Sequence, residues 1–180
     1  MRFPLHITTD AIGHQVRNGL KGVTRYPMVL MLEPLYTCNL ACLGCAIERH
    51  TGRLEDRMPL EDCLQAVEET RAPIVSLCGG EPTIYPELKE LVEGIISRKR
   101  HIYLCTNALL LDTKVFGKIA PHKRLTLNIH LDGMQWRDGE PTKNRSTRRW
   151  RDERKIRATP SRVYIRRCTG ATCWRICKTS

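Results

Sequence analysis

Short apolar segments alternate with amphipathic helical segments from residue 28 to residue 131, and this alternation limits the folds open to the 180-residue chain. The apolar segments have the length of strands, and the apolar residues between them recur at helical spacing. Strands are predicted over residues 28–32, 73–78, 102–105 and 124–131, and helices over residues 60–70, 87–98 and 112–119. Alternating strands and helices are typical of proteins with a parallel sheet. The sequence therefore predicts an α/β fold, the N-terminal part of a partial (β/α) barrel.

The fourth predicted strand has one apolar and one polar side, because successive side chains of a strand point in opposite directions. The apolar side consists of Leu125, Leu127, Ile129 and Leu131, and the polar side of Thr126, Asn128, His130 and Asp132. We expect the apolar side to pack under the helices. The polar side should line the lumen of the barrel, where it can bind a polar cofactor.

A further helix is predicted over residues 8–22, which open with residue types that cap helices. Its apolar stripe, at helical spacing, consists of Ile12, Val16, Leu20 and Val23. We expect this stripe to pack on the body of the domain, and contact with a membrane surface is the alternative.

Polar or metal-binding residues follow each predicted strand. In β/α barrels the chemistry takes place at the carboxyl ends of the strands. Three cysteines follow the first strand, Gly79-Gly80-Glu81-Pro82 the second and Thr106-Asn107 the third, while His130 and Asp132 end the fourth. We therefore expect one site at this end of the barrel. Glu33, after the first strand, is either part of this site or a carboxylate on its rim.

The three cysteines, Cys38, Cys42 and Cys45, are spaced Cys-x-x-x-Cys-x-x-Cys within one short loop. An iron–sulfur cluster held by cysteines alone normally takes four thiolates. Three thiolates leave one iron open to a ligand that carries an amine and a carboxylate. A zinc site with His50 as the fourth ligand is the alternative, although zinc sites usually pair two Cys-x-x-Cys knuckles.

The cysteine spacing, followed one helix and one strand later by Gly79-Gly80-Glu81-Pro82, resembles the signature of the radical SAM superfamily. The resemblance implies a [4Fe-4S] cluster on the three cysteines, S-adenosyl-L-methionine as cofactor and an electron donor such as flavodoxin or ferredoxin. It also implies that Gly79, Gly80 and Glu81 bind the methionyl end of the cofactor and that His130 and Asp132 contact its ribose. Asn107 is a further candidate cofactor contact.

One position departs from the pattern of this superfamily. Many members have an aromatic residue before the last cysteine, where it packs on the adenine, and this chain has Gly44 there. We therefore assign no adenine-binding residue.

A longer set of segments resembles the adenosylhopene-forming radical SAM proteins of bacterial hopanoid biosynthesis. The segments are 25–27, 30–35, 37–45, 78–85, 103–110 and 130–133, so the resemblance covers about residues 1–134. It implies a transferase that adds a 5′-deoxyadenosyl radical to a C=C bond of a hopene-type lipid.

The net charge of +11 is concentrated in the last quarter of the chain. Residues 1–134 contain 16 Lys and Arg and 15 Asp and Glu, a net charge of +1, whereas residues 135–180 contain 14 and 4, a net charge of +10. This Arg-rich tail has no sustained apolar periodicity, so we expect it to be disordered. We divide the chain into a radical SAM core, residues 1–134, and a tail, residues 135–180, that is out of frame if a frameshift lies near residue 135.

Two other functions remain open for such a chain. One is a truncated, frameshifted fragment without catalysis. The other is a basic protein that binds RNA or a membrane surface through its tail, although the near-neutral core argues against a nucleic-acid partner. An auxiliary cluster on the tail cysteines, Cys168, Cys173 and Cys177, is not favoured.

The remaining features of the sequence concern location and the other cysteines. No segment has the length and apolarity of a transmembrane helix, no secretory signal is visible, and nine cysteines suit metal chemistry in a reducing cytoplasm. We expect a cytoplasmic protein, with peripheral membrane contact as the alternative. Cys63 and Cys105 are expected to be buried as small apolar residues, and Cys78 is left open.

Overall fold

The computed structural model describes residues 5–40, 52–132, 135–137, 140–142, 162–169 and 172–177, with side chains over residues 5–40 and 52–129. In chain order the elements are α1 (Leu5–Leu20), β1 (Val29–Leu32), η1 (Leu54–Asp56), α3 (Leu60–Thr70), β2 (Ile74–Leu77), η2 (Pro82–Ile84), α4 (Leu88–Ser97), β3 (His101–Thr106), η3 (Leu111–Val115), β4 (Leu125–Asp132), β5 (Gln135–Arg137), β6 (Glu140–Thr142), β7 (Arg162–Thr169) and β8 (Thr172–Cys177). The predicted strands of the core and its first helices are confirmed. The helix predicted over residues 112–119 is the shorter π-helical turn η3.

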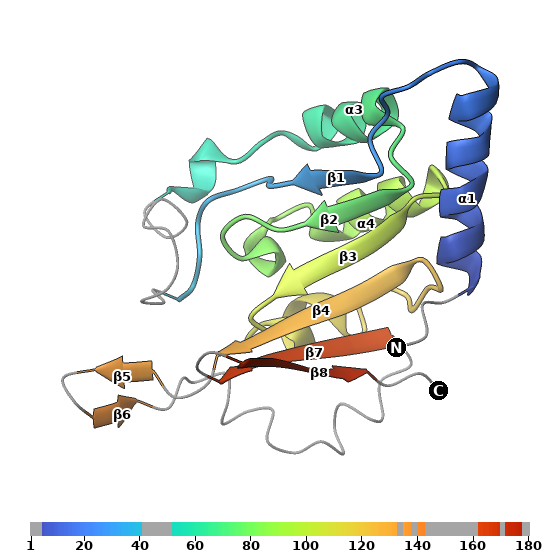
Figure 1. Ribbon diagram of the computed structural model, residues 1–180. Coiled ribbons are helices and arrows are strands. Elements are labelled where there is room, and N and C mark those ends of the chain that lie inside the picture. Colours follow the sequence, from blue (N-terminus) through green and yellow to red (C-terminus); the bar gives the residue numbers. More distant parts are fainter. Residues whose placement is uncertain are drawn as a thin grey trace.

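Strands β1 to β4 pair in parallel and in sequence order. Their register places Leu32, Leu77, Leu104 and Leu127 in one row across the sheet. All four strands therefore end at the same edge, which we call the carboxyl edge (Figure 1). This architecture confirms the predicted α/β fold with a parallel sheet.

One face of the sheet is buried beneath α3, α4 and η3 (Figure 1). The core residues of the strands on this face are Leu32, Val75, Leu77, Ile102, Leu104, Leu125, Leu127 and Ile129. The predicted inward face of the fourth strand is thus confirmed from Leu125 to Ile129. The opposite face of β1–β4, which we call the open face, carries the alternate residues.

The described parts of the tail form strands. β5 and β6 pair in an antiparallel hairpin, β7 pairs in parallel with β4, and β8 pairs antiparallel with β7. We expected disorder here, and for these segments the structure describes strands instead. The physical reason is that β4 would otherwise present a free edge of hydrogen-bonding groups, and Val163, Tyr164 and Ile165 in β7 are residue types that favour strands. The division of the chain at residue 134 stays a prediction.

Helix α1 lies across the amino-terminal ends of the strands (Figure 1). Its buried residues are Ile7 and His14, while Ile12, Val16, Leu20 and Val23 are exposed. The expectation that these four residues pack on the domain is therefore wrong. Polar contacts on the other side of the helix determine its orientation, and apolar periodicity alone could not show this. None of the described helices has the length and apolar character that crossing a bilayer requires.

A polar junction joins α1 to the start of β3 and to the residue before β4. Asp10 Oδ2 lies 2.6 Å from Arg124 Nη1 and 2.8 Å from His101 Nε2. His101 is buried, and its Nδ1 has no hydrogen-bond partner among the described residues. Burial lowers the pKa of His101, and the positive charge of Arg124 lowers it further. Burial by itself would raise the pKa of the Asp10 carboxyl group, but hydrogen bonds from His101 and Arg124 lower it below its usual value.

This junction predicts a loss of stability in mild acid. Because the folded chain lowers the pKa of His101 below its ordinary value of about 6.5, the unfolded chain binds this proton more readily than the folded chain does. The free energy of unfolding should therefore fall over the interval in which the pH drops from about 7.5 through the ordinary histidine pKa of about 6.5. A His101→Gln variant should lose less stability over this interval, measured by urea denaturation at each pH. An equal loss in both proteins would contradict the role given to His101.

Candidate functional site

The carboxyl edge brings together the described residues that sequence reasoning assigned to the site. Cys38 follows β1, Gly79 to Glu81 follow β2, and Asn107 follows β3. His130 and Asp132 are the third-last and the last residue of β4, and only their backbone is described. Cys42, Cys45 and the alternative ligand His50 lie outside the described residues.

The glycine-rich turn packs directly on the chain that leads to Cys38. Gly80 N donates to Leu35 O over 2.9 Å, and Glu81 N donates to Thr37 O over 2.9 Å. A Cβ atom on Gly80 would overlap the carbonyl oxygen of Thr37, and one on Gly79 would overlap that of Leu35. Gly79 also has a φ of +112°, a conformation that favours glycine. Both glycines are therefore required for contact between two chain segments, whatever they contribute to a ligand.

A second contact brings the two ends of the cysteine loop together. Thr37 Oγ1 donates to Gly52 O over 2.9 Å. Thr37 immediately precedes Cys38, and Gly52 is the first residue described after the loop. Downstream, Met58 N donates to Pro34 O over 2.8 Å, and Tyr85 Oη donates to Met58 O over 2.9 Å. The stem of the loop is thus fixed to both β1 and η2.

Glu81 is buried, with 1% of its surface exposed, and its carboxylate accepts four hydrogen bonds. Oε1 accepts from Thr83 N (3.1 Å), from Thr83 Oγ1 (2.6 Å) and from Thr106 Oγ1 (2.6 Å). Oε2 accepts from Asn107 N over 2.8 Å. Glu81 therefore joins the turn after β2 to the end of β3. Sequence reasoning missed this structural role, since the motif gives no sign of which donors surround the carboxylate.

Asn107 extends this connection to the cysteine loop. Its Nδ2 donates to Asn39 Oδ1 over 2.7 Å and lies 3.9 Å from Cys38 Sγ. Its Oδ1 accepts from Leu109 N over 3.1 Å, which fixes the side chain in this orientation. A continuous set of hydrogen bonds thus runs from Glu81 through Asn107 to the residue beside Cys38.

Two thiols, those of Cys78 and Cys105, lie on the open face. Asn128 Nδ2 lies 3.4 Å from Cys105 Sγ, and Cys78 Sγ donates to Glu33 Oε1 over 3.8 Å. Both cysteines are partly exposed, so the expectation that Cys105 is buried as an apolar residue is wrong. The alternation along β3 explains this, because Ile102 and Leu104 take the helix-covered face and leave Cys105 on the other.

Cys63 behaves as expected. It is buried in α3, and burial raises the pKa of its thiol. No group of three His, Cys, Asp or Glu side chains within the described residues is arranged to hold a metal ion. The metal site predicted on Cys38 depends on two cysteines outside those residues.

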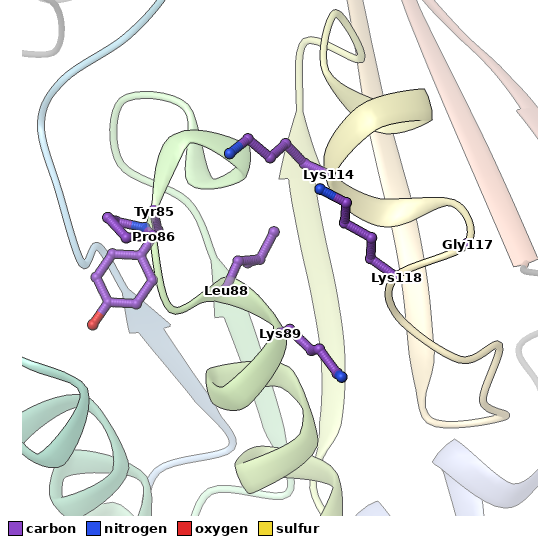
Figure 2. Close-up of a pocket in the computed structure, with 7 residues that line it drawn as sticks. All are labelled: Tyr85, Pro86, Leu88, Lys89, Lys114, Gly117 and Lys118. Atoms are coloured by element: carbon purple, nitrogen blue, oxygen red, sulfur yellow. The ribbon is translucent and has the colours of Figure 1, made fainter.

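A surface pocket of about 420 Å³ lies on the helical side of the sheet, apart from the residues assigned to the site. Figure 2 shows five of the residues that line it: Lys89 of α4, Lys114 of η3, Lys118 after η3, and Tyr85 and Leu88. None of the predicted site residues lines this pocket.

A comparison with protein families matches residues 32–160 to the Radical SAM superfamily. Among curated proteins, the mycofactocin maturase MftC of Mycobacterium ulcerans is 31% identical over 110 residues, which are 59% of this chain and 30% of that protein. GTP 3′,8-cyclase 1 of Mycobacterium tuberculosis is 35% identical over 123 residues, 59% of this chain and 32% of the cyclase. The chain thus spans about 30% of the length of these relatives.

Solved structures give the same fold. The protein SuiB of Streptococcus suis, bound to its precursor peptide SuiA, superimposes with a TM-score of 0.56 at 23% identity. The match covers 74% of this chain and 31% of SuiB. SuiB bound to S-adenosylmethionine superimposes with a TM-score of 0.53 at 22% identity, over 74% of this chain and 30% of SuiB.

The packing of the glycine-rich turn generates a prediction. A Gly80→Ala variant should lower the free energy of unfolding by about 1–3 kcal/mol, because the new methyl group forces the turn away from Thr37. Gly19→Ala is the matched control, since a Cβ atom there meets nothing within 4 Å. The control should be neutral or more stable by up to about 1 kcal/mol. Urea denaturation measures both, and equal stabilities would contradict the close contact at Gly80.

Proposed function

Because this chain belongs to the radical SAM superfamily, whose members use a [4Fe-4S] cluster and S-adenosylmethionine, we propose that Cys38, Cys42 and Cys45 hold such a cluster in an enzyme of this class. The observation that carries the proposal is the position of Cys38 at the carboxyl edge, on a loop stem held by Thr37 and Gly52. Three thiols of one loop are a donor set suited to iron. When bound, the cluster supplies the electron that cleaves S-adenosylmethionine to a 5′-deoxyadenosyl radical.

The residues around Cys38 support a cofactor site beside the cluster. We assign Gly79, Gly80 and Glu81 to the methionyl end of S-adenosylmethionine. Three of the four hydrogen bonds that Glu81 accepts go to Oε1, so Oε2 is the oxygen with capacity for a further donor. The larger effect of Glu81 is to position Asn107. Its carboxylate accepts from the Asn107 backbone, and Asn107 in turn contacts the cysteine loop through Asn39.

Three further residues complete the proposed cofactor site. Asn107 is a partly buried amide at the carboxyl edge, and His130 and Asp132 come at the end of β4. We propose that His130 and Asp132 bind the ribose, as the resemblance to the superfamily implies. Asn128 on the open face supports this, because the sequence alternation predicts His130 and Asp132 on the same side of the strand as Asn128.

The substrate we propose is a hopene-type lipid, from the resemblance of residues 1–134 to the hopanoid-biosynthesis proteins. The open face offers apolar surface on β1, where Val29 is 46% and Met31 62% exposed. An alkene needs such a surface, whereas a nucleotide needs anion-binding groups. The names of the relatives reported above indicate other substrates, and the hopene is our proposal for this chain.

The proposed reaction forms one C–C bond between C5′ of the adenosyl group and the terminal carbon of the alkene. Methionine leaves, and the adenosyl group stays in the product, so S-adenosylmethionine is consumed as a substrate. Two electrons and one proton complete the balance, because cofactor cleavage takes one electron and the adduct takes one electron and the proton. A one-electron donor of the flavodoxin or ferredoxin type would supply them.

The cluster can be tested through its iron content. After anaerobic reconstitution, the parent protein should bind about four irons per chain and show brown charge-transfer absorbance. A Cys38→Ala variant should lose both, because its remaining thiols cannot hold the cluster. Cys63→Ala is the matched control, since Cys63 is buried in α3, and it should keep its iron. Zinc loading in preference to iron would support the alternative zinc site.

The substrate is tested by turnover. Reduced protein incubated with S-adenosylmethionine and diploptene should yield an adenosylhopane, identified by mass spectrometry. We expect weak turnover, because Met31, on the surface proposed for the lipid, is 62% exposed to water. Cleavage of S-adenosylmethionine without any lipid adduct would retain the enzyme class and reject the hopene. A reconstituted cluster with no cleavage at all would support the alternative of a fragment without catalysis.

A further inference from the structure

Helix α1 exposes large apolar side chains on one face. Leu5 is 82% exposed, Ile12 53%, Val16 55% and Leu20 85%. Intervals of seven, four and four residues place these side chains in one continuous row, which we call the outer stripe. A soluble helix normally turns such a row inward, so its exposure calls for an explanation.

The outer stripe cannot be buried by rotating the helix, because polar contacts fix the opposite side. His14 Nε2 lies 3.1 Å from Pro27 O, and His6 Nε2 lies 3.0 Å from Lys123 O. Asp10 pairs with Arg124, as described above. These contacts attach α1 to residues that precede β1 and β4. The helix itself lies at the amino-terminal ends of the strands (Figure 1), and the outer stripe stays exposed.

The exposed charged residues of the last part of α1 and of the segment after it are positive. Arg17, Lys21 and Arg25 are exposed on the last part of α1 and the segment after it. Asp10 is the one acidic residue between Leu5 and Tyr26, and its charge is compensated by Arg124. A row of apolar side chains bordered by cations is typical of helices that lie in the surface of an anionic membrane.

We infer that α1 attaches this protein to the surface of an anionic lipid bilayer. The outer stripe enters the boundary between head groups and acyl chains, and Arg17, Lys21 and Arg25 contact lipid phosphates. Because α1 lies at the amino-terminal ends of the strands, the carboxyl edge with Cys38 then faces the aqueous phase, where a soluble electron donor can reach it. The inference rests on α1 alone and does not depend on the proposed substrate.

The test is co-sedimentation of the purified full chain with vesicles of phosphatidylcholine, with or without phosphatidylglycerol. An Ile12→Ser, Val16→Ser double variant should partition about tenfold more weakly to the anionic vesicles. Met58→Ser is the matched control, since Met58 is exposed but lies outside α1, and it should bind as the parent does. Circular dichroism checks that the helix content of each variant is unchanged.

A gain of binding makes the test independent of folding defects. Gly19 lies beside the outer stripe, and a Cβ atom there meets nothing within 4 Å. Gly19→Leu should therefore strengthen binding severalfold, because it enlarges the apolar row and favours the helix.

Charge reversal separates the helix from the basic tail. An Arg17→Glu, Lys21→Glu variant should bind more weakly than a control with Lys89→Glu and Lys118→Glu, which removes equal charge at the pocket of Figure 2. Binding that no α1 variant alters would assign the membrane contact to the tail and overturn the inference. A parent dimer in gel filtration that the double serine variant abolishes, without an effect on vesicles, would assign the outer stripe to a second copy and also overturn it.

Discussion

Parallel pairing of β1 to β4, with one face buried under α3, α4 and η3, is the constraint on which the rest of the structure depends. A parallel sheet brings the ends of all its strands to one edge, so residues that are far apart in sequence become neighbours. Cys38 and Asn107 are separated by 69 residues, yet the amide nitrogen and the sulfur lie 3.9 Å apart. The burial of one face also leaves the alternate residues of each strand to form the open face.

The position of the site depends on contacts between loops rather than on the strands alone. The glycine-rich turn approaches the chain before Cys38 so closely that no side chain fits, and Thr37 closes the base of the cysteine loop. The buried carboxylate of Glu81 connects this turn to β3 through hydrogen bonds from Thr106 and Asn107. A buried charge needs such partners, since an unpaired carboxylate is costly to remove from water. The same residues that suggest a ligand site are therefore also those that shape it.

Helix α1 shows how polar contacts override an apolar pattern. Its apolar spacing is typical of a helix that packs on a core, and the sequence therefore predicted that this apolar stripe is buried. The contacts of Asp10 with Arg124 and of His14 with Pro27 turn the polar side of the helix toward the domain. Neither partner belongs to the helix, so the helical pattern cannot show these contacts. A carboxylate with a guanidinium partner costs little to bury partly, so the polar side of the helix can face the domain. The apolar side is then left exposed, which gives the fold a surface that its core does not use.

The sequence by itself determined the order and type of the elements of the core, the alternation that divides β4 into two faces, and the superfamily. These follow from local periodicity and from motifs of fixed spacing, which do not depend on distant parts of the chain. Tertiary structure alone decided that Glu81 faces four protein donors, that Cys105 lies on the open face and that α1 turns its apolar side outward. It also decided that β7 pairs with β4. Each of these depends on which distant group is near, because hydrogen bonds and burial are properties of the assembled neighbours and leave no period in the sequence.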